Sequence, residues 1–211
     1  EETPSPFVDE RLRRKMIRAA EVAAHHIGYQ SLGTFEFLVN GNESFYFMEA
    51  NTRVQVEHPI TEMVYNIDLV KEQISIAAGE KLSIRDGMKM RGHSIECRIN
   101  AEDPETFSPS PGTIDFLVLP GGQGIRVDSA AYQGWQIPSD YDSLVAKIAA
   151  LAPSRPEAIR KMQTALEMTT IVGIKTNLPL HLAILGDSDF AEGRYDTRFM
   201  ERFQQKNNSQ K

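Results

Sequence analysis

The sequence has one cysteine, no long apolar run and no excess of basic residues. Cys97 has no second cysteine to pair with, so the chain forms no internal disulfide and a reducing compartment is expected. No apolar stretch is long enough to span a bilayer, and the N-terminal segment lacks a targeting pattern. The formal charge of −6 argues against broad nucleic-acid binding. These absences predict a cytoplasmic protein that binds neither nucleic acid nor membrane.

The usual phosphate-binding signatures are also absent. The 211 residues contain no glycine-rich phosphate loop, no P-loop lysine motif and no dinucleotide fingerprint. The length and a hydrophobic content of 41% suffice for a globular chain of one or two domains. A metal site found in this chain would therefore come without a nucleotide cradle.

Two runs rich in aromatic and β-branched residues, 34–39 and 45–50, are separated by an Asn-Gly-Asn sequence. This pattern predicts a β-hairpin. If the loop has four residues, 41–44, then Glu36 faces Glu49 across the ladder. The hairpin therefore places two carboxylates opposite each other inside its strands.

In the same register Phe37 would face Met48, whereas a two-residue Asn-Gly turn would need a bulge to bring the carboxylates level. Like charges directly opposed in a sheet destabilise it by up to about 1 kcal/mol. Burial among aromatic side chains would increase that cost. We therefore expect a cationic group between Glu36 and Glu49.

The segment after the hairpin continues with alternating polar residues, and alternate side chains of an extended chain share one face. The side chains predicted to project together are Glu49, Asn51, Arg53, Gln55 and Glu57. Carboxylates and an amide suit Mg²⁺, which takes one or two protein carboxylates and completes its shell with water and phosphate oxygens. The planar fork of Arg53 suits a small oxyanion. A solvated edge strand would explain the alternation, but not two glutamates inside an aromatic hairpin.

A long run through this region resembles the distal half of the ATP-grasp site of biotin carboxylase, the ATP-dependent component of acetyl-CoA carboxylase and related biotin enzymes. The run is FEFLVNGNESFYFMEANTRVQVEHPITEM. The resemblance continues through RGHSIECRINAEDP, FSPSPGTI, GIRVDS, YDSLVAK and GIKTNLPL, so it covers nearly the whole chain. A series of blocks is more specific than any single motif.

The resemblance implies an α+β fold. Residues 1–87 would form the distal part of the ATP-grasp domain, an antiparallel sheet with flanking helices. Residues 88–203 would form the β-rich biotin carboxylase C-terminal domain. The polar residues 204–211 have no apolar face, and we expect them to be disordered.

Individual elements can be predicted from capping residues and periodicity. Asp9, Asp68 and Ser154 each precede an apolar pattern of helical spacing and are predicted N-caps. Residues 93–100 alternate as a strand does. Residues 143–151 are ambiguous by periodicity, but the resemblance favours a strand.

The resemblance also assigns the metal and nucleotide contacts. It implies that Glu36, Glu49 and Asn51 hold the divalent ions, Mg²⁺ or Mn²⁺, that bridge the ATP phosphates. Leu38 and Ile171 resemble apolar contacts to the adenine ring, although their chemistry alone would place both in a core.

A second set of residues resembles the bicarbonate and biotin site. Bicarbonate would be bound by Arg53, Gln55 and the backbone of Val56, with Glu57 as the base that deprotonates it. Arg126 resembles the arginine that stabilises the biotin enolate and contacts bicarbonate. Such electrostatic stabilisation is commonly worth about 3 to 4 kcal/mol per donor.

The implied reaction is the first half-reaction of acetyl-CoA carboxylase. Bicarbonate attacks the γ-phosphoryl group of ATP, and the resulting carboxyphosphate breaks down to carbon dioxide and phosphate. Phosphate takes the N1 proton of biotin, and carbon dioxide is captured at that nitrogen. The implied partners are a biotin carboxyl carrier protein and a carboxyltransferase, and the complete enzyme is expected to be a homodimer.

The chain has no counterpart of the N-terminal lobe and lid of a complete enzyme, which carry the lysines that grip phosphate. We expect an ATP-dependent ligase whose isolated distal half is nearly inactive, because one lobe cannot clamp ATP. No carrier or carboxyltransferase segment follows, which favours the free-standing subunit of a bacterial-type acetyl-CoA carboxylase.

Two alternatives stay open. Another ATP-grasp ligase, of the carbamoyl-phosphate-synthetase type, would share Glu36, Glu49 and Asn51 but not the bicarbonate and biotin set. A non-catalytic assembly or dimerisation module would keep the fold without the activity. Metal-dependent binding of ATP would argue against this second alternative.

Overall fold

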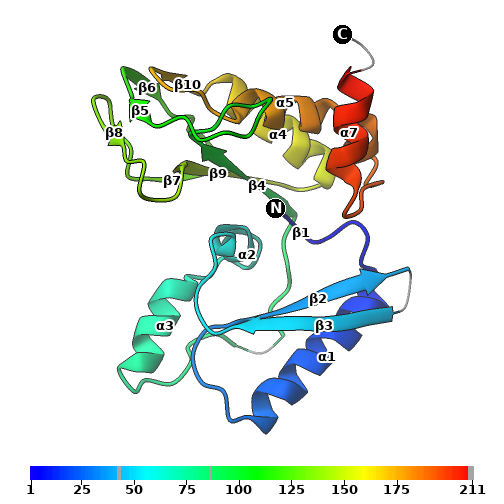
Figure 1. The fold of residues 1–211 in the computed structure, drawn as a ribbon. Coiled ribbons are helices and arrows are strands. Elements are labelled where there is room, and N and C mark those ends of the chain that lie inside the picture. The colour runs from blue at the N-terminus through cyan, green and yellow to red at the C-terminus, as the bar shows by residue number, and fades with distance from the viewer. Residues whose placement is uncertain (42–43, 86, 209–211) are drawn as a thin grey trace. The chain divides into compact units, whose positions relative to one another are not determined.

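The computed structural model describes residues 1–41, 44–85 and 87–208. The chain divides into two compact units (Figure 1). The hairpin unit is Glu2–Arg91, and the sheet unit is Gly92–Lys211 together with Glu1. The division therefore falls after Arg91, whereas the expected domain boundary follows residue 87. The mixture of helices and antiparallel strands confirms the predicted α+β class.

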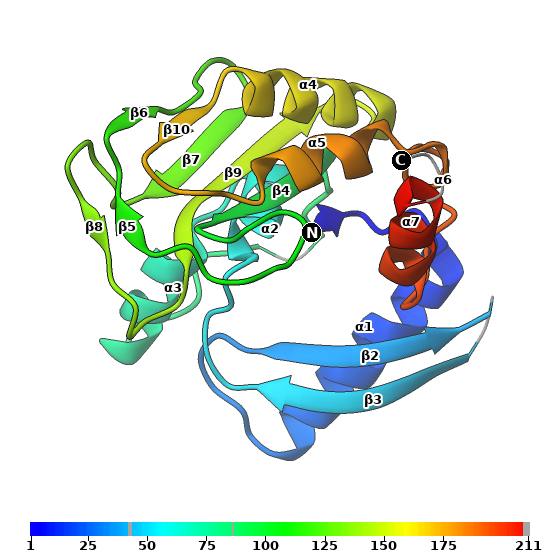
Figure 2. The same ribbon diagram turned by 45° about the horizontal axis from the view of Figure 1, so that its top comes forward.

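The hairpin unit contains a long helix beside a two-stranded antiparallel sheet. Helix α1 (Glu10–His26) begins after Asp9, whose carboxylate accepts a hydrogen bond from the Leu12 amide at 2.7 Å, as the predicted cap requires. Strands β2 (Thr34–Asn40) and β3 (Ser44–Asn51) form the hairpin. Helix α1 lies alongside the hairpin in both views (Figures 1 and 2).

The rest of the hairpin unit consists of a short strand and two short helices. The strand is β1 (Glu2–Thr3), and the helices are α2 (His58–Tyr65) and α3 (Leu69–Ala77). The predicted cap Asp68 accepts a hydrogen bond from a backbone amide in the first turn of α3. The buried carboxylate of Glu62 accepts another from the Leu69 amide at 2.6 Å, which joins α2 to the start of α3.

The sheet unit is built on three antiparallel strands in the order β4–β9–β7. They are β4 (His93–Asn100), β9 (Leu144–Ala152) and β7 (Ile125–Ser129). The ambiguous segment 143–151 is therefore almost entirely strand, as the resemblance favoured. Helices α4 (Arg155–Glu167) and α5 (Leu178–Gly186) lie over one face of this sheet (Figure 2).

The main core of the sheet unit lies between those helices and the sheet. Its most deeply buried large side chains are Ile99, Ile148, Met162 and Leu166. Complete burial of a side chain of this size stabilises the fold by about 1.5 to 3 kcal/mol. The sheet face away from this core carries charged residues of β4, β9 and β7.

Short strands and a second, smaller core complete the β-rich part of the sheet unit. Strand β6 (Phe116–Val118) pairs with β10 (Thr170–Val172), and β5 (Gly112–Thr113) pairs with β8 (Gln136–Ile137). Ile171, on β10, packs against both the main core and the second one. Its surroundings are therefore those of a packing residue.

The C-terminal segment folds into helices α6 (Ser188–Ala191) and α7 (Phe199–Asn208). The prediction of disorder is wrong for residues 204–208, which belong to α7, and residues 209–211 lie outside the described part. The helix is held by an aromatic column in which neighbouring ring centroids are 5.5 to 6.4 Å apart. The column consists of Phe190, Tyr195, Phe199 and Phe203.

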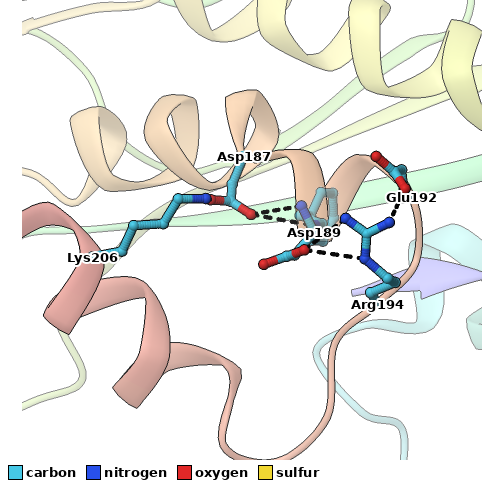
Figure 3. A network of polar contacts seen from close by, with 6 residues as sticks. Asp187, Asp189, Glu192, Arg194 and Lys206 are labelled. Carbon is cyan, nitrogen blue, oxygen red and sulfur yellow. Dashed lines mark hydrogen bonds and ion pairs between the residues drawn. The ribbon is translucent and has the colours of Figure 1, made fainter.

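Figure 3 shows the polar contacts that reinforce this attachment. Asp187 accepts hydrogen bonds from the amides of Asp189 and Phe190 and from Lys206 Nζ on α7 at 2.8 Å. Arg194 pairs with Asp189 and with Glu192. The Lys206 hydrogen bond is the main reason that the pKa of Asp187 lies below its ordinary value. Within the described ranges, no helix is both long and apolar enough to cross a bilayer.

Candidate functional site

The hairpin places its two internal carboxylates directly opposite each other. Glu36 pairs with Glu49 in the ladder, as predicted. Phe37, however, pairs with Phe47 and not with Met48, because the register shifts between Glu36 and Phe37. A bulge in β3 therefore brings the two carboxylates level.

The bulge is needed because the loop is shorter than four residues. Asn40 pairs with Ser44, which already belongs to β3. The predicted turn includes Asn42 and Glu43, which lie outside the described residues. The extra residue in β3 compensates for the shorter loop.

An amide group occupies the position where the sequence predicted a cation. Asn51 Nδ2 donates to Glu36 Oε1 at 2.8 Å and to Glu49 Oε1 at 3.0 Å. Gln55 Nε2 donates to the same Glu36 oxygen at 2.9 Å. These N–H groups offset part of the repulsion between the carboxylates. A bound cation would compete with them for the same oxygen atoms.

Arg53 lies beside this group and keeps its positive charge available. Its Nη1 donates to the Val54 carbonyl oxygen at 3.1 Å, and its Nη2 donates to Asn51 Oδ1 at 3.4 Å. Both acceptors are neutral, and the side chain is exposed. An anion that approached the carboxylate pair would therefore meet the guanidinium next to it.

The single extended row predicted from Glu49 to Glu57 is wrong. Strand β3 ends at Asn51, and residues 52–57 form a loop and turn. Pro59 stands in the first turn of α2, where its missing N–H costs nothing, and this starts a helix instead of continuing the strand. The loop nevertheless returns Gln55 to Glu36.

The end of that loop is fixed by hydrogen bonds to the Gln55 carbonyl. His58 Nδ1 lies 2.7 Å from the Gln55 carbonyl oxygen, and the His58 amide donates to the same oxygen at 3.3 Å. Val56 lies in the turn, and Glu57 occupies the N-cap position of α2. The histidine thus positions the loop that carries the predicted bicarbonate residues.

The carboxylate face of the hairpin continues into an apolar pair. Leu38 is 48% exposed and pairs with Tyr46, which is 58% exposed. Because side chains alternate along a strand, this pair shares a face with Glu36. The expectation from chemistry alone that Leu38 lies in a core is therefore wrong.

Arg126 and Ile171, two further residues predicted for the site, belong to the sheet unit. Arg126 lies on β7 and makes a bidentate pair with Asp128, with Nε to Oδ1 at 2.8 Å and Nη2 to Oδ2 at 2.9 Å. Lys147 Nζ lies 3.5 Å from the same carboxylate. Burial alone would raise the pKa of Asp128, but the Arg126 hydrogen bond and the two cations outweigh it and hold the pKa below its ordinary value.

Sequence reasoning passed over the charged residues of β4, which share this sheet face. The ladder places Arg98, Lys147 and Asp128 in one row across the three strands. It places Glu96, Ala149 and Arg126 in the next row. The alternation of Glu96 and Arg98 with apolar residues was the available signal, but it does not distinguish a solvated face from a buried one.

Glu96 is the least expected of these groups. It is 2% exposed, and neither carboxylate oxygen has a hydrogen-bond partner among the described residues. Burial, together with the nearby Glu1 carboxylate, raises its pKa to about 7, while Lys147 and Arg98 act in the opposite direction. Glu96 therefore titrates near neutral pH, unlike an ordinary glutamate.

The comparisons with known proteins agree over both units. Residues 96–202 match the family model of the biotin carboxylase C-terminal domain, and residues 1–85 match that of the carbamoyl-phosphate synthase L chain, ATP binding domain. The biotin carboxylase of Haemophilus influenzae is 50% identical over 203 residues, which are 96% of this chain and 45% of that protein. Biotin carboxylase 1 of Bacillus subtilis is 49% identical over 206 residues, 96% of this chain and 46% of that protein.

A solved structure is similar over the same extent. It is the biotin carboxylase domain dimer of the Hydrogenobacter thermophilus 2-oxoglutarate carboxylase, in complex with MgADP, ADP and bicarbonate. The TM-score is 0.92 at 46% identity, over 95% of this chain and 45% of that one. The chain thus spans a little under half the length of the relatives that it matches. The family model alone covers half of the chain, and the chain belongs to the biotin carboxylase family.

Proposed function

We propose that this chain is the distal half of an ATP-dependent biotin carboxylase, in which the hairpin unit holds the metal-bound phosphates of ATP and the bicarbonate. The observation that carries the proposal is the opposed pair Glu36 and Glu49, bridged by one amide group. The related Hydrogenobacter thermophilus structure supports the ligand set, because that protein was solved with MgADP and bicarbonate.

The donor set of the hairpin fits a hard divalent cation. Glu36 and Glu49 provide carboxylate oxygens, and Asn51 can present its amide oxygen if the side chain turns over. No group of three or more His, Cys, Asp or Glu side chains suited to a metal occurs in the described part of the chain. Mg²⁺ or Mn²⁺ would therefore take the remaining ligands from phosphate and water, and would neutralise charge on the phosphates when bound.

The residues next to the metal ligands suit a small oxyanion. Arg53 offers an exposed guanidinium to bicarbonate, with Gln55 and the backbone of Val56 beside it. Glu57 would accept the bicarbonate proton. Fixing bicarbonate next to the γ-phosphoryl group makes the attack effectively intramolecular, which is the main contribution that such binding residues make.

The arginine that stabilises the biotin enolate is proposed to come from the charged face of the sheet unit. Arg126 is the residue predicted from sequence, but its Nε and Nη2 both donate hydrogen bonds to the carboxylate of Asp128. Arg98, on the neighbouring row of the same face, is the alternative, and it too is paired with a carboxylate, because its Nη2 lies 2.5 Å from Glu1 Oε1. The two arginines can be separated by substituting each one to alanine in the same assay.

Leu38 is proposed to contact the adenine ring, because it is apolar, exposed and on the carboxylate face. Ile171 remains the second proposed adenine contact, although its packing against two cores provides a sufficient structural role. Biotin would arrive on a carrier protein, a carboxyltransferase would use the carboxybiotin, and the complete enzyme would be a homodimer. The related Hydrogenobacter thermophilus domain was solved as a dimer, which supports the last point.

The test is bicarbonate-dependent ATP hydrolysis with Mg²⁺, measured with and without free biotin. It is made on the 211-residue chain and on the full-length gene product. We expect activity in the full-length protein, stimulation by biotin, and little activity in the chain alone. Hydrolysis with no response to bicarbonate or biotin would contradict the proposal and favour another ATP-grasp ligase. Absence of metal-dependent ATP binding would favour a non-catalytic assembly module.

A further inference from the structure

The exposed apolar pair on the hairpin lacks an explanation in packing. Tyr46 is 58% exposed and Leu38, opposite it, is 48% exposed, although both lie in regular strands. The opposite face of the same hairpin carries the aromatic packing. Phe37 contacts Phe45 and Phe47 there, with ring centroids 5.3 and 6.1 Å away. Phe47, on that opposite face, is also 58% exposed, but its ring contacts Phe37, whereas Leu38 and Tyr46 share their face with the carboxylate pair.

The polarity of that exposed face changes along the strands. At one end, Asn51 and Gln55 approach the carboxylate pair with hydrogen-bond donors, and Arg53 adds a positive charge. At the other end, toward the turn, the next side chains on the face are Leu38 and Tyr46. Two residues along a strand correspond to about 7 Å. Charged, polar and apolar groups therefore follow one another over a short distance.

The groups of a nucleoside triphosphate change from charged to apolar in the same order. Its phosphates require the metal at the carboxylates, and its base is flat and aromatic. The base cannot lie toward the Asn51 end, because amide and guanidinium groups occupy that direction. It can lie over the apolar pair, where an aromatic side chain provides a contact surface with little loss of conformational entropy.

We propose that Tyr46 is a nucleotide-contact residue, whose ring lies against the base or ribose of the nucleotide held at the Glu36–Glu49 pair. This inference rests on the proposed function, since it takes the phosphate position from the metal site. The ring is the contacting group, so phenylalanine should replace it and alanine should not. The aromatic contacts on the opposite face fix the strand that presents it.

The first test measures directly whether a bound nucleotide covers the Tyr46 side chain. Nitration of tyrosines by tetranitromethane is followed by peptide mass spectrometry on the full-length gene product. MgATP should slow the nitration of Tyr46 at least about 5-fold, a factor expected if stacking on a base is worth about 1 kcal/mol. Tyr132 and Tyr141, which are 63% and 81% exposed in the sheet unit, are the internal controls. Magnesium pyrophosphate, which has no base, should protect Tyr46 much less than MgATP.

The second test uses kinetics of the same protein. Tyr46→Ala should raise the KM for ATP about 5- to 30-fold with kcat within twofold, because truncating an aromatic ring on which a base stacks costs about 1 to 2 kcal/mol. Tyr46→Phe should stay within about twofold of wild type, as should the control Tyr141→Ala.

The outcomes separate this inference from the proposed function. Equal nitration of Tyr46 with and without saturating MgATP, or equal KM values for Tyr46→Ala and Tyr141→Ala, would overturn the role of Tyr46 while leaving bicarbonate-dependent hydrolysis intact. If wild type hydrolyses ATP without any response to bicarbonate, the proposed function fails. Protection of Tyr46 by MgATP would then still support the nucleotide contact.

Discussion

The β2–β3 hairpin and the β4–β9 ladder are both antiparallel pairs, yet the side chains of the hairpin are largely exposed and those of the ladder are largely buried. The hairpin leaves Leu38, Tyr46 and Phe47 about half exposed and places its glutamates where donors from a loop can reach them. The β4–β9 ladder buries most of its residues, including the carboxylate of Glu96, and exposes none of them fully.

This difference indicates that the ladder contributes mainly to stability and that the hairpin face contributes mainly to the chemistry. The buried ladder supports the main core of the sheet unit, with α4 and α5 over one face. The hairpin gains less from burial, and its exposed apolar and acidic groups are unfavourable unless a ligand uses them. We therefore expect substitutions in the ladder to change stability most, and substitutions on the hairpin face to change activity most.

The largest effect is expected in the core of the ladder. Ile148 is fully buried on β9, and Ile148→Ala should lower the free energy of unfolding by about 2 to 5 kcal/mol, because it removes contacts and leaves a cavity. Urea unfolding followed by circular dichroism measures the change. Leu38→Ala, on the hairpin, is the control and should cost less than about 1 kcal/mol. Equal losses for the two variants would remove the contrast between the regions.

The next effect is on the hairpin and concerns activity. Glu49→Gln should reduce bicarbonate-dependent ATP hydrolysis about 100-fold or more, because a metal ligand contributes several kcal/mol of charge stabilisation. The thermal midpoint should stay constant or rise slightly, since a repulsive pair is removed. Glu21→Gln, on the exposed surface of α1, is the matched control. A variant that keeps its activity would show that the hairpin carboxylates do not hold the metal.

The buried carboxylate of the ladder predicts a pH-dependent effect on stability. The folded-state pKa of Glu96 is raised to about 7, so the folded state loses stability as pH rises from the ordinary glutamate value to about 7. Glu96→Gln should remove this loss. The difference between variant and wild type in unfolding free energy should therefore shift by about 2 to 3 kcal/mol in favour of the variant between pH 4 and pH 8. A difference that does not change with pH would mean that Glu96 does not titrate in this range.

The smallest effect concerns the ion pair on the sheet face. The pKa of Asp128 is lowered, so its contribution to stability is present at neutral pH and is lost as pH falls through the folded-state pKa. Asp128→Asn should cost about 0.5 to 1 kcal/mol at pH 7, because the group is partly exposed and screened, and the cost should be smaller at pH 3, below the ordinary pKa of aspartate. Thermal melts at the two pH values measure it. A cost that stays the same at low pH would assign the effect to packing.

The sequence predicted the parts of the site that depend on local pattern. Aromatic and β-branched runs indicated the hairpin, and the carboxylates proved to be opposed as expected. A bulge was expected only for a two-residue turn, and the alternation of side chains alone did not decide the length of the loop. The return of Gln55 to Glu36 depends on hydrogen bonds between segments far apart in the chain, which no local pattern encodes.

The remaining differences concern burial, which depends on tertiary contacts. The alternation in β4 identified a strand but not that its polar face buries Glu96. Residues 204–208 were expected to be disordered because that segment contains no apolar residue. They are helical because Phe199 and Phe203, one turn apart, anchor α7 to the aromatic column. In the same way, the apolar character of Leu38 did not predict that its side chain is exposed on the hairpin.

The most direct measurement is the binding of Mn²⁺ in the presence of ATP, followed by electron paramagnetic resonance on the full-length gene product. Glu36→Gln is compared with Glu96→Gln, so that one carboxylate is removed from each of the two regions. We predict that Glu36→Gln weakens Mn²⁺ binding about 10-fold or more and that Glu96→Gln leaves it unchanged. Unchanged binding in Glu36→Gln, or an equal loss in both variants, would contradict the assignment of the metal-nucleotide site to the hairpin.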